Sequence, residues 1–531
     1  TTRLVGSEMC IRDRYNKQTI AAKMTDVPGH TRSIIDPMYD AGIRLLHVGI
    51  NSACPLPSVP TFCRWRSPSG NDLLLVYQKD YGEDEVLPDG KTVVSINFTG
   101  DNHGPHSYER VKKIYADLRK RYPQAQLVGA SFNDVARELL LIKKDLPVVT
   151  SEIGDTWIFG YGGAPIRMAK FRAVSRLYSQ WLNEGKIKKD SDVALDFAAE
   201  LGLIAEHTQG VDVKTHLRQW DKYDMDKFLK GRSEGVFSMA EASWKEIDNY
   251  IDSAIAFLPA SLQKEAREVV AEVDKVKLED NSKMKPMARK RWEQPIAGGM
   301  TLAGLSYQMF DGDDYDDFQN RYLRARYEWA LDDLGKRGLK ESHAVSVTLY
   351  AQTMAQSVRK EKKGTRIITE LRFPENEKVD KRVYPERIQV NCFTTKNGKR
   401  SEVALTIYGK PAVRLPESYW LSFTVPGIEL VIAEKMGERV NLMDVVEKGN
   451  RQMHGIDRYV DLITSGETIR ISSKEAFLLN VGEAQGLNYS TNYPDKRKGV
   501  HFNLNNNLWG TNFSMWNDCL LYTSDAADDK A

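Results

Sequence analysis

Three side chains able to take part in catalysis lie close together near the start of the chain. Within residues 25–33, Asp26 supplies a carboxylate, His30 an imidazole and Arg32 a guanidinium, and a Pro-Gly pair stands between the first two. Pro-Gly predicts a sharp turn that would hold these side chains rigidly together. Carboxylates and imidazoles serve as nucleophiles, proton carriers and metal ligands. A structural interpretation is also open, in which Asp26 caps the next helix and His30 lies on the surface.

The flanking sequence indicates how this turn is positioned. Apolar residues 20–22 precede it, an amphipathic segment at 34–41 follows it, and a second apolar run occupies residues 45–48. We interpret this order as strand, turn, helix and strand. Asp26 would then lie just past the carboxyl end of a strand, where parallel α/β folds place their chemistry.

A second candidate residue, His207, lies far downstream. It follows an apolar helical run at residues 195–204 and stands in a polar segment, 205–212. An Asp and a His brought together from distant segments are typical zinc ligands.

These segments resemble motifs of glycoside hydrolase family 38, the α-mannosidases. TDVPGHTRSIIDPMYDAG (25–42) is similar to that family's DPFGHS segment, and EHTQGVD (206–212) to its HHDAITGT segment. Between them, FTGDNHGPHS (98–107) stands where the family has a Gly-Asp-Asp segment, and SEIGDTWIFGYGGAPIRMAKFR (151–172) stands where it has GDF…GYYTSRP. The four segments follow the family's order within residues 17–280. The nearest resemblance is to a mannosidase-like bacterial family, domain of unknown function 5054.

The resemblance implies a zinc-dependent retaining glycosidase. Asp26 takes the position of the residue that is both nucleophile and zinc ligand in that family, and His207 takes the position of a later ligand. The family's other two ligands, an HxD pair on its first strand, have no counterpart here and are expected upstream of residue 1. Without them we expect the chain as given to bind Zn²⁺ poorly and to be inactive.

The general acid/base is harder to assign. The second Asp of the family's Gly-Asp-Asp segment aligns with Asn102, which cannot donate a proton usefully. We therefore predict the neighbouring Asp101 as the acid/base, in a polar loop that also contains His103 and His106. In the structural alternative this loop only leads into a helix, which Ser107 would cap.

Other residues are predicted to contact the substrate. These are His30, Arg32, His103, Asp155 and Trp157. An aromatic ring such as that of Trp157 is a common platform for a sugar, although a position in the barrel core is an almost equal alternative. Glu152 is a second candidate acid.

The order of apolar patterns predicts several domains, as expected for 531 residues. Residues 15–190 alternate strands with helices, which together with the resemblance predicts a truncated (β/α) barrel of the glycoside hydrolase or deacetylase type. Residues 191–280 are helical throughout and predict a helical bundle. Residues 285–518 change to a period of two and predict an antiparallel β-sandwich with linking segments. Within the first domain, short apolar runs predict strands at residues 73–77, 93–98, 125–130 and 148–149.

Both ends of the chain resemble translated sequencing adapters. SEMCIRDR occurs within residues 1–14 and CLLYTSDAADD within residues 519–531. We exclude both ends from the predicted fold and expect them to pack against nothing. In the alternative they are genuine but poorly ordered termini.

The composition of the chain excludes some classes of binding partner. A net charge of +2 argues against a surface for polyanions, so no nucleic acid is expected, and no apolar run is long enough to span a membrane. Outside the suspected adapters three cysteines remain without CxxC spacing, which favours neither a disulfide framework nor a structural zinc site. The compartment stays open. A periplasmic or extracellular location is weakly favoured, and any signal peptide would be missing from the given sequence.

Three functional hypotheses follow. The first is a metal-dependent retaining glycoside hydrolase that acts on α-mannoside-like linkages of glycans. The second is a metal-dependent carbohydrate esterase or deacetylase, in which a zinc-bound water would be the nucleophile. The third is a non-catalytic carbohydrate-binding relative, which Asn102 in place of a carboxylic acid favours.

Overall fold

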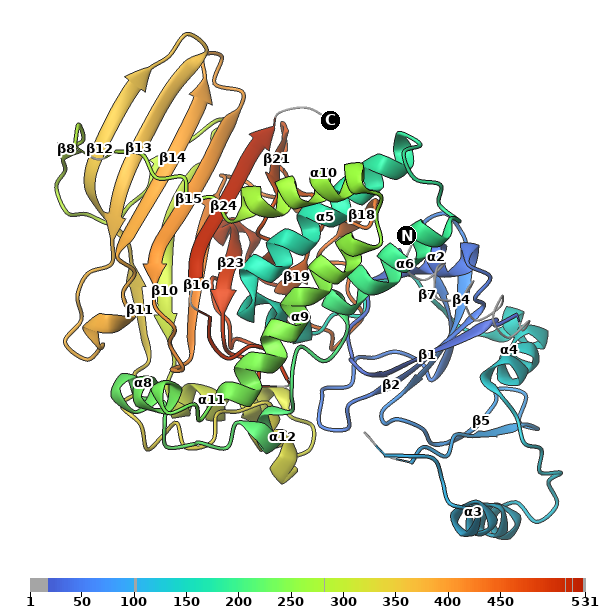
Figure 1. Ribbon diagram of the computed structural model, residues 1–531. Helices are drawn as coiled ribbons and strands as arrows, with labels where there is room; N and C mark the ends of the chain where they lie inside the picture. Colours follow the sequence, from blue (N-terminus) through green and yellow to red (C-terminus); the bar gives the residue numbers. More distant parts are fainter. Residues whose placement is uncertain (1–17, 100–102, 281, 511, 518, 529–531) are drawn as a thin grey trace. The chain divides into compact units, whose positions relative to one another are not determined.

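The computed structural model describes residues 18–99, 103–280, 282–510 and 512–517, and the backbone of 519–528. The chain divides into two compact units (Figure 1). One contains the residues up to 154 together with 446–449, and the other contains 155–445 together with the residues from 450 onward. Among the described residues, every helix is too short or too polar to cross a lipid bilayer.

The first unit is built on a five-stranded sheet with the order β1-β2-β4-β3-β7. The strands are β1 (Ala21–Asp26), β2 (Leu45–Ile50), β3 (Phe62–Arg66), β4 (Asp72–Gln78) and β7 (Val148–Val149). Strands β1, β2 and β4 run parallel, whereas β3 is antiparallel to β4. Every residue of β2 and β4 is buried, as is typical of central strands in a parallel sheet. The carboxyl ends of β1, β2 and β4 therefore meet at one edge of the sheet.

Three α-helices lie in the described part of this unit. They are α2 (Ile35–Asp40), α3 (Tyr108–Arg121) and α4 (Phe132–Leu141). Helix α4 begins at a capping box formed by Ser131 and Asp134, and its buried Leu139 joins Leu45 and Val76 of the sheet in one apolar core.

Most of the predicted alternation of strands and helices is present. Strands occur as expected near residues 45–48, 73–77 and 148–149. The run at 93–98 forms only β6 (Val93–Ser95), which pairs with β5 (Asp84–Val86) in a separate ribbon. The mixed α/β character is confirmed. Within the described residues, however, β1 and β7 are the outer strands of an open sheet, so closure into a barrel is not confirmed.

The strand predicted at residues 125–130 is wrong. These residues form an irregular segment before α4, and the side chain of Val128 is 71% exposed. A short apolar run gains little from an extended conformation unless another strand pairs with its N–H and C=O groups.

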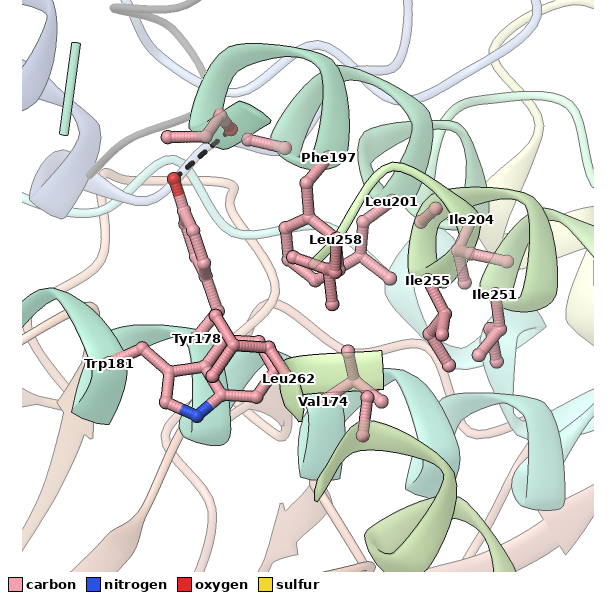
Figure 2. Packing of buried hydrophobic residues seen from close by; sticks show 14 of the residues in the cluster. Val174, Tyr178, Trp181, Phe197, Leu201, Ile204, Ile251, Ile255, Leu258 and Leu262 are labelled. Atoms are coloured by element: carbon pink, nitrogen blue, oxygen red, sulfur yellow. Dashed lines mark hydrogen bonds between the residues drawn. The ribbon is translucent and has the colours of Figure 1, made fainter. Parts of the chain in front are cut away.

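The second unit starts with a helical cluster. Its main helices are α5 (Pro165–Asn183), α6 (Asp192–Gly202), α8 (Met225–Ser233), α9 (Ser238–Ala256) and α10 (Ala260–Val273). Figure 2 shows apolar side chains of α5, α6, α9 and α10 in a shared core, including Val174, Trp181 and Phe197, and all three are fully buried. The helical pattern predicted for 191–280 is therefore present. Helix α5, which the sequence pattern placed with the first domain, packs in the same core.

Two antiparallel sheets complete this unit. One has the order β11-β10-β16-β23-β22-β19, with β9 paired to β10, and the other has the order β18-β17-β20-β21-β24-β15-β14-β13-β12-β8. The period-two pattern within residues 285–518 thus predicted strands correctly. The strands are β8 (Lys285–Pro286), β9 (Gln294–Pro295), β10 (Thr301–Met309), β11 (Val347–Tyr350), β12 (Gln352–Lys360), β13 (Gly364–Arg372), β14 (Arg387–Thr395), β15 (Ser401–Lys410), β16 (Glu417–Thr424), β17 (Leu430–Lys435), β18 (Glu438–Asn441), β19 (Met453–Gly455), β20 (Tyr459–Ile463), β21 (Thr468–Ser473), β22 (Leu478–Val481), β23 (Val500–Asn506) and β24 (Cys519–Asp528).

Strand β24 corrects the expectation for the carboxyl-terminal segment. Its backbone pairs with β15 on one side and with β21 on the other, so residues 519–528 do not lie free of the fold. Without β24, strands β15 and β21 would each expose a row of unpaired N–H and C=O groups, and an extended segment between them satisfies both. Residues 1–14 and 529–531 lie outside the described residues.

Candidate functional site

Asp26 is the last residue of β1 and has a left-handed backbone conformation with φ +83°. Residues other than Gly rarely adopt this conformation, which is several-fold enriched in Asp and Asn. The backbone N–H of Asn51, the first residue after β2, donates to the Asp26 carbonyl oxygen at 2.9 Å. Strained backbone of this kind is found preferentially at functional sites, which makes the end of β1 a candidate.

Two side chains from neighbouring strand ends hold the Asp26 carboxylate. Asn51 Nδ2 donates to Asp26 Oδ1 at 2.8 Å, and the Tyr81 hydroxyl donates to the same oxygen at 2.5 Å. Asn51 directly follows β2, and Tyr81 lies shortly after β4. The three side chains therefore meet at the carboxyl-end edge of the parallel strands, where the strand pattern placed Asp26.

The helix that follows the turn does not use Asp26 as its cap. The side chain of Thr31 accepts a hydrogen bond from the Ser33 N–H at 3.4 Å and caps the short helix η1 (Arg32–Ile34). The buried Glu152 carboxylate accepts from the Thr31 hydroxyl at 3.0 Å and from the Arg32 N–H at 2.7 Å. Glu152, the second candidate acid, therefore holds the start of this helix.

His30 and Arg32 are tied to the segment around β7. His30 and Ile153 exchange two backbone hydrogen bonds, of 2.8 and 3.0 Å, and Arg32 Nη1 donates to the Thr150 carbonyl oxygen at 2.8 Å. The His30 Nε2 atom lies 3.2 Å from the Val27 carbonyl oxygen, and burial lowers the pKa of His30 to about 4. These hydrogen bonds hold the backbone of the turn, and the lowered pKa leaves the imidazole neutral at pH 7. Contacts of both side chains with a substrate stay a prediction.

The segment that carries Tyr81 lies directly on the sheet. A Cβ atom at Gly49 in β2 would lie 2.8 Å from the Tyr81 Cα and 2.9 Å from the Asp80 carbonyl oxygen. Because no heavy-atom contact of a real Cβ is that short, only glycine at this position lets the segment come so close. The close approach at Gly49 thus helps to place the Tyr81 hydroxyl within hydrogen-bond distance of Asp26.

Polar side chains inside the sheet support the same segment. Lys23 Nζ donates to the Tyr81 carbonyl oxygen at 2.9 Å and lies 3.0 Å from His47 Nδ1. His47 Nε2 lies 2.8 Å from Gln78 Oε1. Burial lowers the pKa of Lys23 to about 8, and burial followed by the charge of Lys23 lowers the pKa of His47 to about 4.

These supporting residues are not among the predicted site residues, although the sequence contains a signal for some of them. Asn51 and Tyr81 follow the predicted strands at 45–48 and 73–77, so the strand-end rule that selected Asp26 applies to them too. Lys23 and His47 are polar residues within otherwise apolar strands, and they are partners in the register of β1 and β2.

The predicted acid/base Asp101 and its neighbour Asn102 lie outside the described residues. The start of their loop is described: the ring of Phe98 meets the ring of Tyr81 edge-on, with 5.5 Å between the centroids. This part of the loop therefore touches the tyrosine that binds Asp26.

The rest of this loop leads into α3. His103 is exposed, and His106 Nε2 lies 3.0 Å from the Asn97 carbonyl oxygen. The Ser107 side chain accepts a hydrogen bond from the Arg110 N–H at 3.2 Å and caps α3. The capping role proposed as the structural alternative is thus present.

Three of the predicted site residues lie in the second unit. The ring of the buried Trp157 is 5.5 Å from the ring of His207, and the backbone N–H of Trp157 donates to Asp155 Oδ2 at 2.9 Å. The Tyr322 hydroxyl donates to Asp155 Oδ1 at 3.0 Å. Burial raises the pKa of Asp155 to about 6. The structure therefore connects Asp155, Trp157 and His207 through Trp157.

The loop that carries His207 is fixed by the buried Gln209. The side-chain Nε2 of Gln209 donates to the carbonyl oxygens of Ile204 at 2.8 Å and Glu206 at 2.9 Å. Its backbone N–H donates to the Asn512 carbonyl oxygen at 2.9 Å. His207 is thus presented by a loop with defined hydrogen bonds on both sides of it.

The described residues do not by themselves fit the zinc site that the resemblance implies. Among them, no group of three or more His, Cys, Asp or Glu side chains is placed to hold a metal ion. Asp26 belongs to one unit and His207 to the other, so their convergence on a common ion stays a prediction.

Comparison with known proteins agrees with the motif resemblance. Residues 162–294 match the model of the family described as "Domain of unknown function (DUF5054)". An α-mannosidase from Enterococcus faecalis V583 has a similar structure, with a TM-score of 0.51 and 9% sequence identity over 99% of this chain and 76% of that one. A glycosyl hydrolase family 38 protein from Enterococcus faecalis gives a TM-score of 0.44 at 9% identity, over 99% of this chain and 75% of that one. No curated protein matches the sequence.

The likeness to the first of these structures shows a shared fold, and the match over 162–294 confirms the predicted family resemblance for that segment. Neither comparison assigns a role to a residue. Roles therefore rest on the geometry around Asp26 and on the residues of the second unit.

Proposed function

We propose that this protein is a glycoside hydrolase that acts on α-mannoside-like linkages of glycans, with Asp26 as its nucleophile. The observation that carries this proposal is the Asp26 carboxylate at the carboxyl-end edge of a parallel sheet, held by Asn51 and Tyr81. The likeness in fold to an α-mannosidase supports the choice of reaction and substrate.

The two hydrogen bonds suit a nucleophilic carboxylate. Retaining glycosidases form a covalent glycosyl-enzyme, so the carboxylate must approach the anomeric carbon in one orientation and later leave it. Donors on Oδ1 from Asn51 and Tyr81 fix that orientation. Hydrogen bonds to a charged oxygen are also stronger than neutral ones, which stabilises the carboxylate as it is released.

A retaining reaction also needs an acid/base, with the two carboxyl groups about 5–5.5 Å apart. We propose Asp101 for this role. It lies three residues beyond Phe98, whose ring contacts Tyr81, and three extended residues reach about 10 Å. We further propose that His30, Arg32, His103, Asp155 and Trp157 contact the substrate.

We also propose that the protein binds a zinc ion, but no step of the proposed reaction depends on that ion. Asp26 and His207 are the proposed ligands, and the described residues offer no group of three. We expect the chain as given to retain clearly less than one zinc ion after dialysis against metal-free buffer, measured by atomic emission. Retention of one ion, lost in Asp26→Ala and in His207→Ala, would instead show a complete site.

The decisive test is hydrolysis of an aryl α-mannoside by this chain and, if the gene encodes further residues, by its complete product. Asp26→Asn should lower kcat/KM by several orders of magnitude, because it removes the nucleophile. Asp40→Asn, which changes an exposed carboxylate at the end of α2, is the matched control and should leave the rate unchanged. The product first released should have the α configuration, as seen by NMR.

Three other results would redirect the assignment. Release of the β anomer would exclude the retaining mechanism. Hydrolysis of acetylated sugars without cleavage of any glycoside would identify a carbohydrate esterase or deacetylase. Tight sugar binding without turnover of either substrate would identify a carbohydrate-binding relative.

A further inference from the structure

Lys23 is an unusual residue in the interior of the first unit. Its Nζ donates to the Tyr81 carbonyl oxygen at 2.9 Å, and among the described residues no carboxylate pairs with it. Nζ also lies 5.2 Å from the centroid of the Phe98 ring and 5.8 Å from that of Phe132. A partly buried cation is costly unless contacts of this kind satisfy it, and these contacts tie Lys23 to the segment that carries Tyr81.

His47 completes the surroundings of this cation. Its Nδ1 lies 3.0 Å from Lys23 Nζ and its Nε2 lies 2.8 Å from Gln78 Oε1. Because a cation can only donate, Nδ1 must be the acceptor, and Nε2 then carries the proton that it donates to Gln78. The hydrogen bonds therefore all donate in one direction, from Lys23 in β1 through His47 in β2 to Gln78 at the end of β4.

Tyr81 is hydrogen-bonded to residues of strand β1 through its backbone and through its side chain. Its carbonyl oxygen accepts from Lys23, and its hydroxyl donates to Asp26, three residues farther along the same strand. Gly49 leaves room for the backbone between these two points. The position of the hydroxyl on Asp26 thus depends on where Lys23 holds the backbone.

We propose that Lys23 is a positioning residue of the Asp26 site, which acts by holding Tyr81 in place to donate to the carboxylate. This inference rests on the proposed role of Asp26 as nucleophile. Among the described residues, the hydrogen bonds of Lys23 run to Tyr81 and His47 and not to Asp26, so its effect on the reaction is expected to pass through Tyr81.

A double-mutant cycle in the complete protein tests this dependence. Lys23→Met should lower kcat about 10- to 100-fold and change KM by less than about threefold, as expected for a misplaced catalytic contact. In a Tyr81→Phe background the same substitution should cost less than about threefold, because the contact that it positions is already gone. Lys144→Met, which changes an exposed lysine in the same unit, is the matched control. An equal loss in both backgrounds would overturn the proposal, because Lys23 would then support the fold generally.

A second measurement separates this proposal from the assignment of glycosidase activity. Protein labelled with ¹³C at tyrosine Cζ gives one signal that Tyr81→Phe removes, and this signal reports the environment of the Tyr81 hydroxyl. Lys23→Met should shift that signal, whereas Lys144→Met should leave it in place. If neither the parent nor any variant hydrolyses a glycoside, the proposed function fails. The NMR spectrum then decides by itself whether Lys23 positions Tyr81. A shift then supports the positioning of Tyr81 by Lys23, and an unmoved signal overturns it.

Discussion

The hydroxyl of Tyr81 donates a 2.5 Å hydrogen bond to Oδ1 of Asp26, which joins the ends of two parallel strands through one pair of side chains. Asn51 donates to the same oxygen from the strand between them. The carboxylate is therefore oriented by the sheet itself, before any substrate is present. Such preorganisation is what a nucleophile at the carboxyl-end edge of a parallel sheet requires.

Tyr81→Phe should therefore reduce catalysis without unfolding the protein. Loss of a hydrogen bond to a charged group costs about 1.5–3 kcal/mol, which corresponds to about a 10- to 150-fold lower kcat/KM on an aryl α-mannoside. Tyr108→Phe, at a tyrosine that is 74% exposed on α3, removes the same atom elsewhere and should have no effect. Full activity in Tyr81→Phe would show that this hydrogen bond is not used.

The close approach at Gly49 gives a second prediction. In Gly49→Ala the new Cβ would lie 2.8 Å from the Tyr81 Cα, so the segment must move away from the sheet. Overpacking of this kind costs about 1–3 kcal/mol, and the melting temperature should fall together with kcat. Gly202→Ala, where a Cβ would meet nothing within 4 Å, is the control. If both variants melt at the same temperature as the parent, the approach is not as tight as described.

The position of Asp26 could be predicted because its cause is local. An apolar run, a Pro-Gly turn and a second apolar run place a residue at a strand end, and β1 ends at Asp26. The partners of Asp26 could not be predicted in the same way. Tyr81 stands 55 residues away, and its contact depends on the strand order and on Gly49, neither of which the local pattern contains.

Two failures have a similar origin. The apolar residues at 125–130 have strand propensity, but the described fold offers them no strand to pair with. The segment at 519–528 resembles a translated sequencing adapter and is excluded from the predicted fold, yet its backbone lies between β15 and β21. Whether a short segment becomes a strand depends on its neighbours in space as much as on its own side chains.

His47 predicts how stability depends on pH. Burial lowers its pKa to about 4, whereas an unfolded histidine has a pKa near 6.5, so the unfolded state takes up a proton first as the pH falls. The free energy of unfolding should therefore decrease between about pH 6.5 and pH 4, and His47 accounts for part of this loss, on the order of 1–3 kcal/mol. His47→Gln should flatten the pH dependence in denaturant titrations. His343→Gln, at an exposed histidine, is the control and should keep the parental slope. An unchanged slope in His47→Gln would mean that the imidazole is already protonated or accessible in the folded state.

The last prediction concerns β24, where the resemblance to an adapter and the structure disagree. The adapter-like sequence of residues 519–531 predicts that deletion changes nothing, whereas the pairing with β15 and β21 predicts that deletion opens two strand edges inside one sheet. We expect deletion to destabilise the protein, because the loss of β24 leaves N–H and C=O groups of β15 and β21 without hydrogen-bond partners. A chain that ends at residue 518 should melt at a lower temperature and associate more readily, measured by calorimetry and light scattering. A chain that ends at residue 528 keeps the whole strand and should behave like the parent. Equal melting of all three chains would show that the native sheet closes without this segment.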